Sequence, residues 1–256
     1  MSPFPDAPGT PDIHRATSKR DGANVMPREA RTLIDTVYAR LRADIITGRL
    51  APGIRLKVER LRAESGVGAS TMREALTRLC ADGLAISEGQ RGFRVASVSL
   101  ADLMDVTALR QLFETRALRE AIAQGDDAWR EGVEMAYGKL SAVEARLHDD
   151  LAGNASVWEA RNRDFHRALG AACTSPRTLR FIDVLYNQHE RYRRLSLITR
   201  SLERDIHAEH KGIFDATMAR DADLACRLTE EHIARTAELL AAGIVDGAWF
   251  GLAGGR

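Results

Sequence analysis

Three histidines and one asparagine in the C-terminal half of the chain have the side chains and the spacing of a metal site. Asn162 and His166 are four residues apart and share one face of a helix. His210 and His232 flank a turn predicted near Asp221, each about eleven residues from it, or about 16 Å along a helix. An antiparallel hairpin therefore places both imidazoles at the same height. Three imidazoles and a carboxamide suit a divalent transition metal such as zinc, nickel or manganese.

The alternative is that these are ordinary polar residues of helices. For any single histidine that alternative is favoured, and the paired spacing brings the two interpretations close to even. His207 lies one turn before His210 and is expected to be a neighbour of the site, not a ligand. A bound metal could also activate water in a hydrolase. The chain has no HExxH motif, however, and Asp164 is predicted to point away from His166.

The elements that must position these residues are helices. Over residues 99–246 apolar residues recur at helical spacing, and no βαβ pattern, GxGxxG motif or P-loop occurs. We expect an all-α antiparallel bundle. Trp129 and Trp158 are predicted to be packing residues, and the basic run Arg191, Arg193 and Arg194 a solvated face or a dimer contact. The predicted helices span residues 100–123, 128–150, 155–173, 177–200, 203–220 and 222–245.

Residues 28–98 predict a smaller domain with the element order of a winged helix-turn-helix. A first helix is predicted to begin at Thr32 and to end at Gly48, and a short second helix to span Val58 to Ser65. A third helix has Ser70 as its predicted N-cap and ends at Gly83. Two strands follow, at residues 84–87 and 92–96. The turn at residues 66–69 sets the third helix across the second, so that its N-terminal residues can enter a DNA major groove.

Basic and hydroxyl side chains of this domain have the chemistry of DNA contacts. Arg73 can reach O6 and N7 of guanine, whereas Arg73 considered alone would be a solvated surface residue. Ser70 and Thr71 can hold phosphates at the helix N-terminus. Arg91, at the tip of the hairpin, can reach a minor groove or the DNA backbone. The candidate contacts in this segment are Ser70, Thr71, Arg73, Arg78, Arg91 and Gly92.

Charge and composition support a division into two parts. Residues 1–98 carry sixteen Lys and Arg against eleven Asp and Glu, and residues 99–256 carry twenty-one against twenty-five. A basic part joined to an acidic part suggests a nucleic-acid-facing module. The three widely spaced cysteines suggest buried thiols in a reducing cytosol. The chain shows no secretory signal, and no apolar run is long enough for a transmembrane helix.

The two ends are predicted to be tails. Residues 1–27 hold five of the seven prolines and lack apolar periodicity, which predicts a disordered tail, or alternatively an arm that a partner orders. Residues 247–256 are predicted to form a C-terminal tail.

The motifs of residues 30–240 resemble the GntR family of bacterial transcription regulators, in its FadR-like branch with an FCD effector domain. The segment from Arg42 to Gly53 looks like the family's opening signature; Arg73-Glu-Ala-Leu, Leu79, Gly83-Leu84 and Gly92-Phe93-x-Val95 follow at the expected offsets. The resemblance implies a mostly α protein. A winged helix-turn-helix over residues 28–98 would precede an FCD-like all-α antiparallel bundle over residues 99–246, which would bind the effector and dimerise.

The chain departs from the family pattern at two places. Val58 stands where the family has an acidic residue, and Gly68-Ala69 stands where it has Ser-Arg. The second departure puts the operator sequence in doubt. Lys57 and Arg60, with Arg62, are expected to compensate through contacts with the DNA backbone.

The resemblance also implies site residues in the helical domain. Asn162, His166, His210 and His232 match the metal ligands of metal-binding FCD proteins, and Asn in place of Asp should weaken metal binding. Arg110 and Glu114 match the family's Arg-x-x-x-Glu motif and imply a clamp for an acid effector. A structural salt bridge between Arg110 and Glu114 is an equally favoured alternative.

These expectations describe a DNA-binding transcription regulator that is not an enzyme. A homodimer would bind a palindromic operator in double-stranded DNA, as a repressor in the family's commoner arrangement, in the bacterial cytoplasm at the nucleoid and without a membrane. The effector would be a small organic acid; the run from Gly66 to Ser70 looks like that of members that sense dicarboxylates. The alternatives are an architectural DNA-binding dimer without an effector and a metal-dependent hydrolase.

Overall fold

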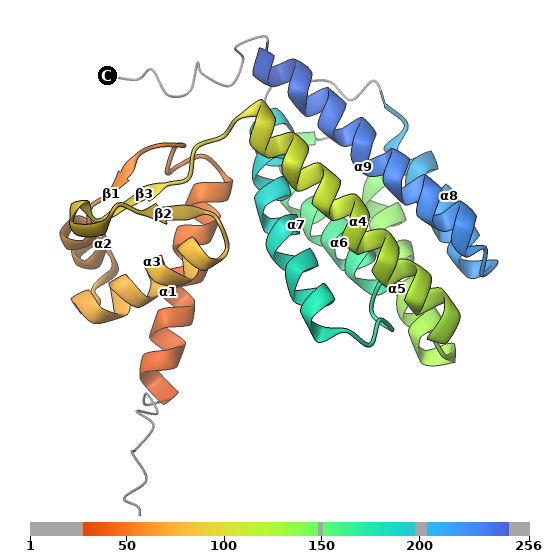
Figure 1. The fold of residues 1–256 in the computed structure, drawn as a ribbon, viewed down its shortest axis with the longest axis horizontal. Helices are drawn as coiled ribbons and strands as arrows, with labels where there is room; N and C mark the ends of the chain where they lie inside the picture. The colour runs from red at the N-terminus through yellow and green to blue at the C-terminus, as the bar shows by residue number, and fades with distance from the viewer. Residues whose placement is uncertain (1–27, 148–150, 198–203, 246–256) are drawn as a thin grey trace, which may run out of the picture.

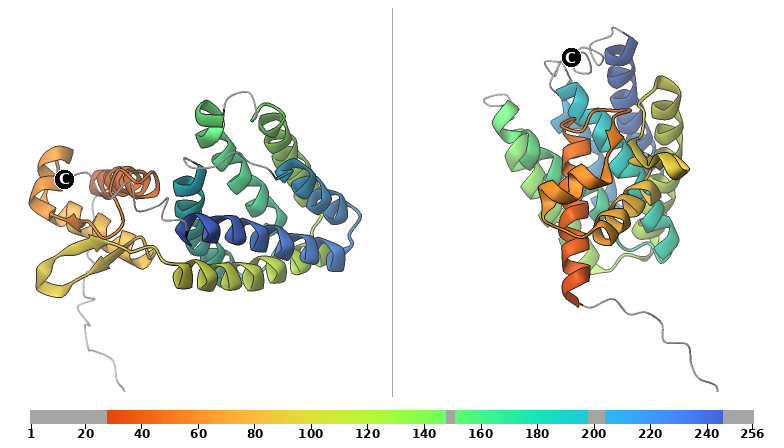
Figure 2. Two further views of the ribbon diagram at one scale, coloured as in Figure 1. Left: turned by 90° about the horizontal axis from the view of Figure 1, so that it is seen from above. Right: turned by 90° about the vertical axis from the view of Figure 1, so that its left-hand side faces the viewer.

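Two units make up the part of the chain that the structure describes. The structure is a computed structural model and describes residues 28–147, 151–197 and 204–245. The predicted tails, residues 1–27 and 247–256, lie outside these ranges. Figure 1 shows a small unit that contains the strands beside a larger helical unit, and Figure 2 shows the two side by side from above. The predicted fold class, a winged helix-turn-helix followed by a helical bundle, is confirmed.

The first unit, here called the winged-helix unit, combines helices with a small antiparallel sheet. Its elements are α1 (Arg28–Ile46), β1 (Arg55–Leu56), α2 (Val58–Ser65), α3 (Ala69–Ala81), β2 (Ala85–Ser87), the 3₁₀ turn η1 (Gly89–Arg91) and β3 (Phe93–Val95). The strand order is β1-β3-β2. Leu41, Met72, Leu76 and Val95, from three of these elements, are fully buried in one core. Strand β1 was not predicted, because two residues are too short to show an alternating pattern.

The turn between α2 and α3 differs from its prediction at the helix start. Gly66 ends α2 with φ 66°, a left-handed conformation that favours glycine. The chain then enters α3 at Ala69, with Gly68 as the N-cap and no side-chain cap. The prediction of Ser70 as N-cap was therefore wrong: the left-handed turn at Gly66 starts the helix early, and Ser70 lies in its first turn.

The second unit, here called the helical unit, is a bundle. All six predicted helices are present, and the largest boundary difference is that α5 ends at Glu144, short of residue 150. Trp129 and Trp158 are buried in its main core, which confirms their prediction as packing residues. No helix in the described ranges is long and apolar enough to cross a membrane. The helices are α4 (Leu100–Gln124), α5 (Asp127–Glu144), α6 (Leu151–Leu169), α7 (Pro176–Leu197), α8 (Ile206–Met218) and α9 (Ala222–Val245).

Helix α7 holds the two units together. Arg42 of α1 donates to Asn187 at 2.6 Å and to Glu190 at 2.9 Å. Arg163 of α6 donates to the same two acceptors, at 2.6 and 2.7 Å. Gln188 donates to the backbone of the winged-helix unit beside Gly83, where a Cβ atom would lie 2.2 Å from the Gln188 amide. Gly83 also has φ 69°, a left-handed conformation that favours glycine.

The prediction that the basic run of α7 forms a solvated face was wrong, while its alternative, a dimer contact, stays a prediction. Arg193 is buried and forms a two-pronged ion pair with Glu159 of α6, at 3.1 and 2.9 Å. Arg194 pairs with Glu190 at 2.9 Å, and Arg191 is buried and donates to the Ala96 carbonyl. Because α1, α4 and α6 all pack on α7, Arg191 and Arg193 are enclosed by other elements, whereas Arg177 and Arg180 of the same helix are exposed. Glu190 and Arg194 are four residues apart, as in a helical ion pair, but no spacing marks Glu159 or Ala96 as a partner.

Replacing Glu190 with Gln should weaken the contact between the units in a pH-dependent way. Burial raises the pKa of Glu190, but Arg42 and Arg163 outweigh burial and lower it to about 2. Because the folded-state pKa is depressed, the stabilisation is complete above the ordinary value of 4.5 and is lost as the pH falls towards 2. E190Q should lose about 2–3 kcal/mol of unfolding free energy at neutral pH. Urea unfolding should show this difference shrinking below about pH 4.5.

The matched control is Glu59→Gln, which removes an exposed carboxylate paired with Arg62. Its effect should stay below about 1 kcal/mol. A loss in E190Q that is the same at every pH would contradict the role given to the Glu190 charge.

Candidate functional site

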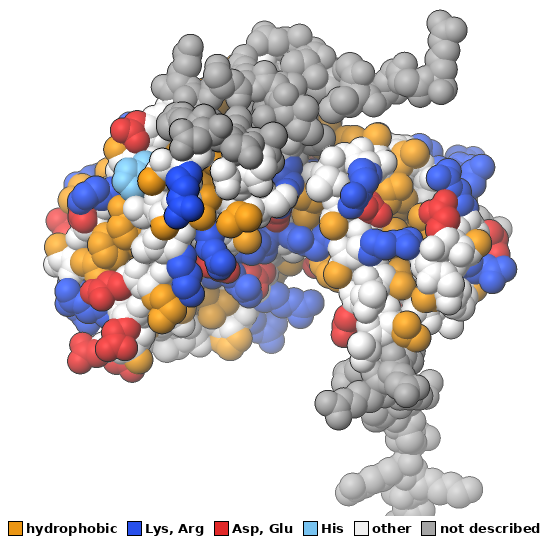
Figure 3. All heavy atoms as spheres, turned by 180° about the vertical axis from the view of Figure 1, so that it is seen from behind, with side chains coloured by type: hydrophobic (Ala, Val, Ile, Leu, Met, Phe, Trp, Pro, Cys, Tyr) orange, Lys and Arg blue, Asp and Glu red, His pale blue; other side chains and the backbone are white. Residues whose placement is uncertain are grey.

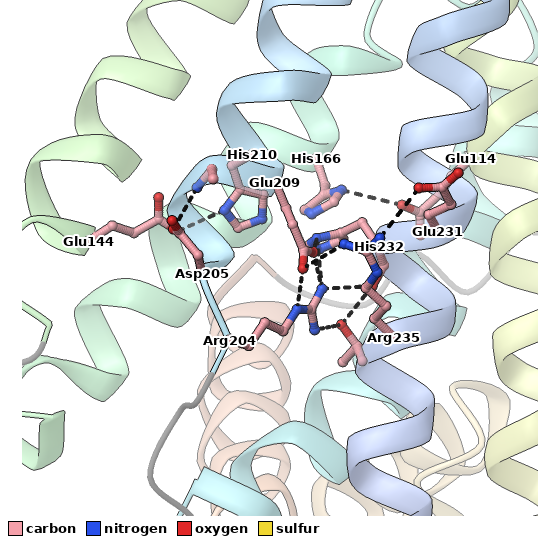
Figure 4. A network of polar contacts seen from close by, with 12 residues as sticks. Glu114, Glu144, His166, Arg204, Asp205, Glu209, His210, Glu231, His232 and Arg235 are labelled. Carbon is pink, nitrogen blue, oxygen red and sulfur yellow. Dashed lines mark hydrogen bonds and ion pairs between the residues drawn. The ribbon is translucent and has the colours of Figure 1, made fainter.

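His166, His210 and His232 meet inside the helical unit. Their candidate ligand nitrogens all lie within 4.8 Å of one another, and all three residues are buried. The rings of His210 and His232 have centroids 4.6 Å apart, as the hairpin of α8 and α9 predicts. His166 reaches them from α6, with its ring centroid 5.2 Å from that of His232. Residues far apart in the chain thus form one compact cluster, here called the histidine cluster (Figure 4).

A carboxylate lies behind each imidazole. Glu144 of α5 lies 2.7 Å from His210 Nδ1, and Glu209 of α8 lies 2.9 Å from His232 Nδ1. Glu114 of α4 lies 3.5 Å from His166 Nδ1. An ionised carboxylate can only accept a hydrogen bond, so Glu144 holds the proton on Nδ1 of His210 and leaves the lone pair on Nε2. Nδ1 of His232 faces Arg204 Nη2 at 3.2 Å as well as Glu209, and the contact of His166 with Glu114 is not a hydrogen bond. Metal-binding histidines in proteins are held in this way.

The cluster contains buried polar atoms without partners. Nε2 of His210 and both ring nitrogens of His166 make no hydrogen bond within the described structure. Burial lowers the pKa of His166 to about 4, against the opposing effect of Glu114, and lowers that of His232 well below 6.5. Neutral imidazoles with free lone pairs are the form that binds metals. The residues therefore fit a divalent transition metal, whose charge would satisfy atoms that otherwise cost about 1–3 kcal/mol each.

Asn162 offers a fourth ligand atom. It lies one turn before His166 on α6 and is buried. Its Nδ2 donates to the Tyr186 hydroxyl at 2.7 Å, while its Oδ1 is buried without a partner. The free end of the amide in this arrangement is the oxygen, the atom that a metal requires.

Arg110 and Glu114 form a buried ion pair, with Arg110 Nε 2.6 Å from Glu114 Oε1. Burial raises the pKa of Glu114, but Arg110 and His166 outweigh burial and lower it to about 2. One carboxylate oxygen faces Arg110 and the other faces His166, so the structure favours the salt-bridge interpretation for Glu114. The Arg110 guanidinium carbon lies 5.0 Å from the Tyr186 ring centroid, which keeps this cation at the edge of the cluster.

His207 and Asp164 lie outside the histidine cluster, as their spacing from the predicted ligands implies. His207 is half-exposed and lies 3.2 Å from Glu144, so it shares a carboxylate with His210 without joining the cluster. Asp164 pairs with Arg161 on the exposed side of α6.

Sequence reasoning missed Glu144 and Glu209. Glu144 and His210 are 66 residues apart in the sequence, and no spacing rule predicts a contact between them. Sequence spacing could have revealed Glu209. It directly precedes His210, so the helical hairpin that places His210 opposite His232 also places Glu209 close to His232. Arg204 and Arg235 also reach Glu209 (Figure 4), with Arg235 3.4 Å from it.

The residues predicted to contact DNA lie on two parts of the winged-helix unit. Ser70 and Thr71 are in the first turn of α3, and Arg73 is exposed one turn further on. Arg91 is exposed at the tip of the wing, followed by Gly92 with φ 90°, a left-handed conformation suited to glycine. Figure 3 shows Lys and Arg side chains at the far end of this unit and along the bundle side that faces it.

Other predicted DNA contacts are already paired within the unit. Arg78 pairs with Asp35 of α1 at 2.6 Å, which holds α3 on α1. Arg60 is exposed and pairs with Glu64 at 2.6 Å. Lys57 is exposed at the N-terminus of α2. These ion pairs are surface pairs, which are weak enough to exchange for phosphate contacts.

Comparison with known proteins identifies both units. The family model "Bacterial regulatory proteins, gntR family" matches residues 33–95, and the model "FCD domain" matches residues 105–235. The chain belongs to the GntR family, in its FCD branch. The regulator is 42% identical over 213 residues to the HTH-type transcriptional regulator BphR of Paraburkholderia xenovorans (strain LB400), covering 83% of this chain and 87% of that one.

A second curated relative and a solved structure support the assignment to this family. The regulator is 32% identical over 200 residues to the HTH-type transcriptional repressor GlaR of Escherichia coli (strain K12), covering 77% of this chain and 90% of that one. The structure of E. coli McbR/YncC shares the fold, with a TM-score of 0.69 at 19% identity over 83% of this chain and 98% of that one. Both curated relatives are named transcription regulators. The regulator therefore binds DNA and is not an enzyme, which sets the hydrolase alternative aside.

His210→Ala should abolish tight zinc binding, because it removes a ligand whose position Glu144 fixes. Loss of an outer partner of a metal ligand already costs about 10–100-fold in affinity, so we expect more than about 100-fold here. Isothermal titration of the metal-free protein with zinc measures this. His207→Ala is the matched control, since it touches the same carboxylate from outside the cluster and should bind zinc like the wild type. Equal losses in both variants would contradict the assignment.

Proposed function

We propose that this regulator is a homodimeric repressor that binds a palindromic operator. A small organic acid, bound at a divalent metal in the helical unit, modulates its affinity for that operator. The observation that carries this proposal is the histidine cluster, in which three buried imidazoles have carboxylates behind Nδ1. Zinc, nickel or manganese would be held by Asn162, His166, His210 and His232. These four ligands would leave coordination positions that a carboxylate of the effector can fill.

Arg110 supports an acid as the effector. It is the cation at the edge of the cluster, and only its Nε is used by Glu114. A guanidinium offers further donors in a planar fork that matches a carboxylate. The acid would thus meet a metal on one side and a cation on the other, and a dicarboxylate would satisfy both.

Contacts on α6 and α7 give the helical unit a route to the winged-helix unit. Arg163 follows the ligand Asn162 on α6, and it shares Asn187 and Glu190 with Arg42 of α1. A shift of α6 on binding would change the contacts that hold α1. Binding would then alter the placement of the two DNA-reading heads of a dimer. Exposed apolar residues of α4, among them Met104 and Leu112, offer a surface for the second copy.

Acid binding should require the metal. A thermal-shift screen of mono- and dicarboxylic acids, each with zinc, with nickel, with manganese and with chelator, tests the proposal, since a ligand that binds only the folded state raises the melting temperature. We expect a shift from at least one acid that disappears with chelator and in His210→Ala. Operator affinity measured alongside should fall with that acid. An operator affinity indifferent to every acid and metal would favour an architectural dimer instead.

Arg73→Ala should relax operator selectivity. Losing a two-pronged contact with guanine should cost about 1–3 kcal/mol at one base pair, measured by titrating operator variants changed at single positions. Lys57→Ala is the control: loss of a phosphate contact should weaken binding to all sequences equally and reduce the salt dependence. Selectivity unchanged in Arg73→Ala would remove Arg73 from base recognition.

A further inference from the structure

His189 is a buried histidine for which the proposed metal site has no use. It lies on α7, one turn after Tyr186 and one turn before Arg193, and it is fully buried. Its Nδ1 lies 2.9 Å from Nη1 of Arg193. Its Nε2 is buried and makes no hydrogen bond within the described structure.

The partner of Nδ1 determines what Nε2 can do. A guanidinium only donates hydrogen bonds, so Nδ1 of His189 must accept, and the ring proton of the neutral imidazole must sit on Nε2. Nε2–H is therefore a donor without an acceptor. His210 has the opposite polarity, because the Glu144 carboxylate behind its Nδ1 leaves a lone pair on Nε2. His189 is thus built to meet an acceptor, whereas His210 is built to meet a cation.

The side chains around His189 reach the histidine cluster. The ring of Tyr186 on the same face of α7 is 6.1 Å from that of His166, and its hydroxyl holds Asn162. The guanidinium carbons of Arg110 and Arg193 lie 5.0 and 4.6 Å from the Tyr186 ring centroid. Burial, with the charges of Arg110 and Arg193, lowers the pKa of His189 well below 6.5, which keeps the imidazole neutral.

We propose that the Nε2–H of His189 donates a hydrogen bond to a second oxygen of the acid effector and thereby selects acids that carry one. This proposal rests on the proposed function and names the class of effector: an acid whose first carboxylate meets the metal and whose other end bears a carboxylate or another oxygen acceptor. A monocarboxylic acid of the same length would place a methyl group against a buried donor and leave that donor unpaired. Sites with buried polar groups reject such analogues strongly.

The test compares matched pairs of acids on the full-length, zinc-loaded protein. Succinate, glutarate and adipate are titrated against butyrate, valerate and hexanoate, and zinc affinity is measured in parallel. The variants are His189→Leu, which removes the donor, and His189→Gln, which keeps an amide N–H donor while losing the imidazole that Arg193 contacts. Arg193 retains its ion pair with Glu159 in both variants.

The wild type should prefer one dicarboxylate over its monocarboxylate partner, and His189→Leu should lose about 10–100-fold of affinity for that dicarboxylate alone. Zinc affinity should be unchanged in both variants, and His189→Gln should recover part of the preference. An undiminished preference in His189→Leu would overturn the role of His189, as would a joint loss of zinc and acid binding in both variants. A wild type that binds zinc but no acid would instead overturn the proposed effector.

Discussion

The pairing of buried charges on α7 is the interaction on which the arrangement of this molecule depends. Glu190 accepts hydrogen bonds from Arg42, Arg163 and Arg194, and Arg193 is matched by Glu159. Without those partners a helix so rich in charge could not lie between the winged-helix unit and the bundle, because an unpaired buried charge is strongly destabilising. With them, α7 presents one face to the histidine cluster and the other to α1.

The chemistry of the site follows from how each imidazole is held. Glu144 behind His210 leaves a lone pair on Nε2, whereas Arg193 behind His189 leaves a proton on Nε2. The same residue type can thereby supply both the acceptor that a cation needs and the donor that an anion needs. Burial lowers the pKa of His166, His189 and His232, and the hydrogen-bond partner of a neutral ring decides which nitrogen carries the proton.

The same geometry gives the proposed effector a route to the winged-helix unit. Residues of α6 and α7 at the candidate site are next to residues that hold the winged-helix unit: Asn162 precedes Arg163, and Tyr186 precedes Asn187. Neighbours on a helix point in different directions, so one short segment can face both the site and α1. In the proposed function, small movements at the site would act directly on the contacts of Arg42.

The sequence by itself determined the fold class and half of the candidate site. Periodicity revealed the six helices of the bundle, and the spacing of Asn162 with His166 and of His210 with His232 revealed the cluster, because both rest on local helix geometry. Tertiary structure decided the rest. Glu144 behind His210, the burial of Arg193 and the free Nε2–H of His189 all depend on which helix faces which. Glu144 and His210 lie on different helices, and a single sequence carries no repeating signal for such a contact. Arg193 is four residues from His189 on α7, but only the packing of other helices buries both. The charge run of α7 shows the consequence: its composition is that of a solvated face, and only the packing of α1, α4 and α6 around it makes it the centre of the molecule.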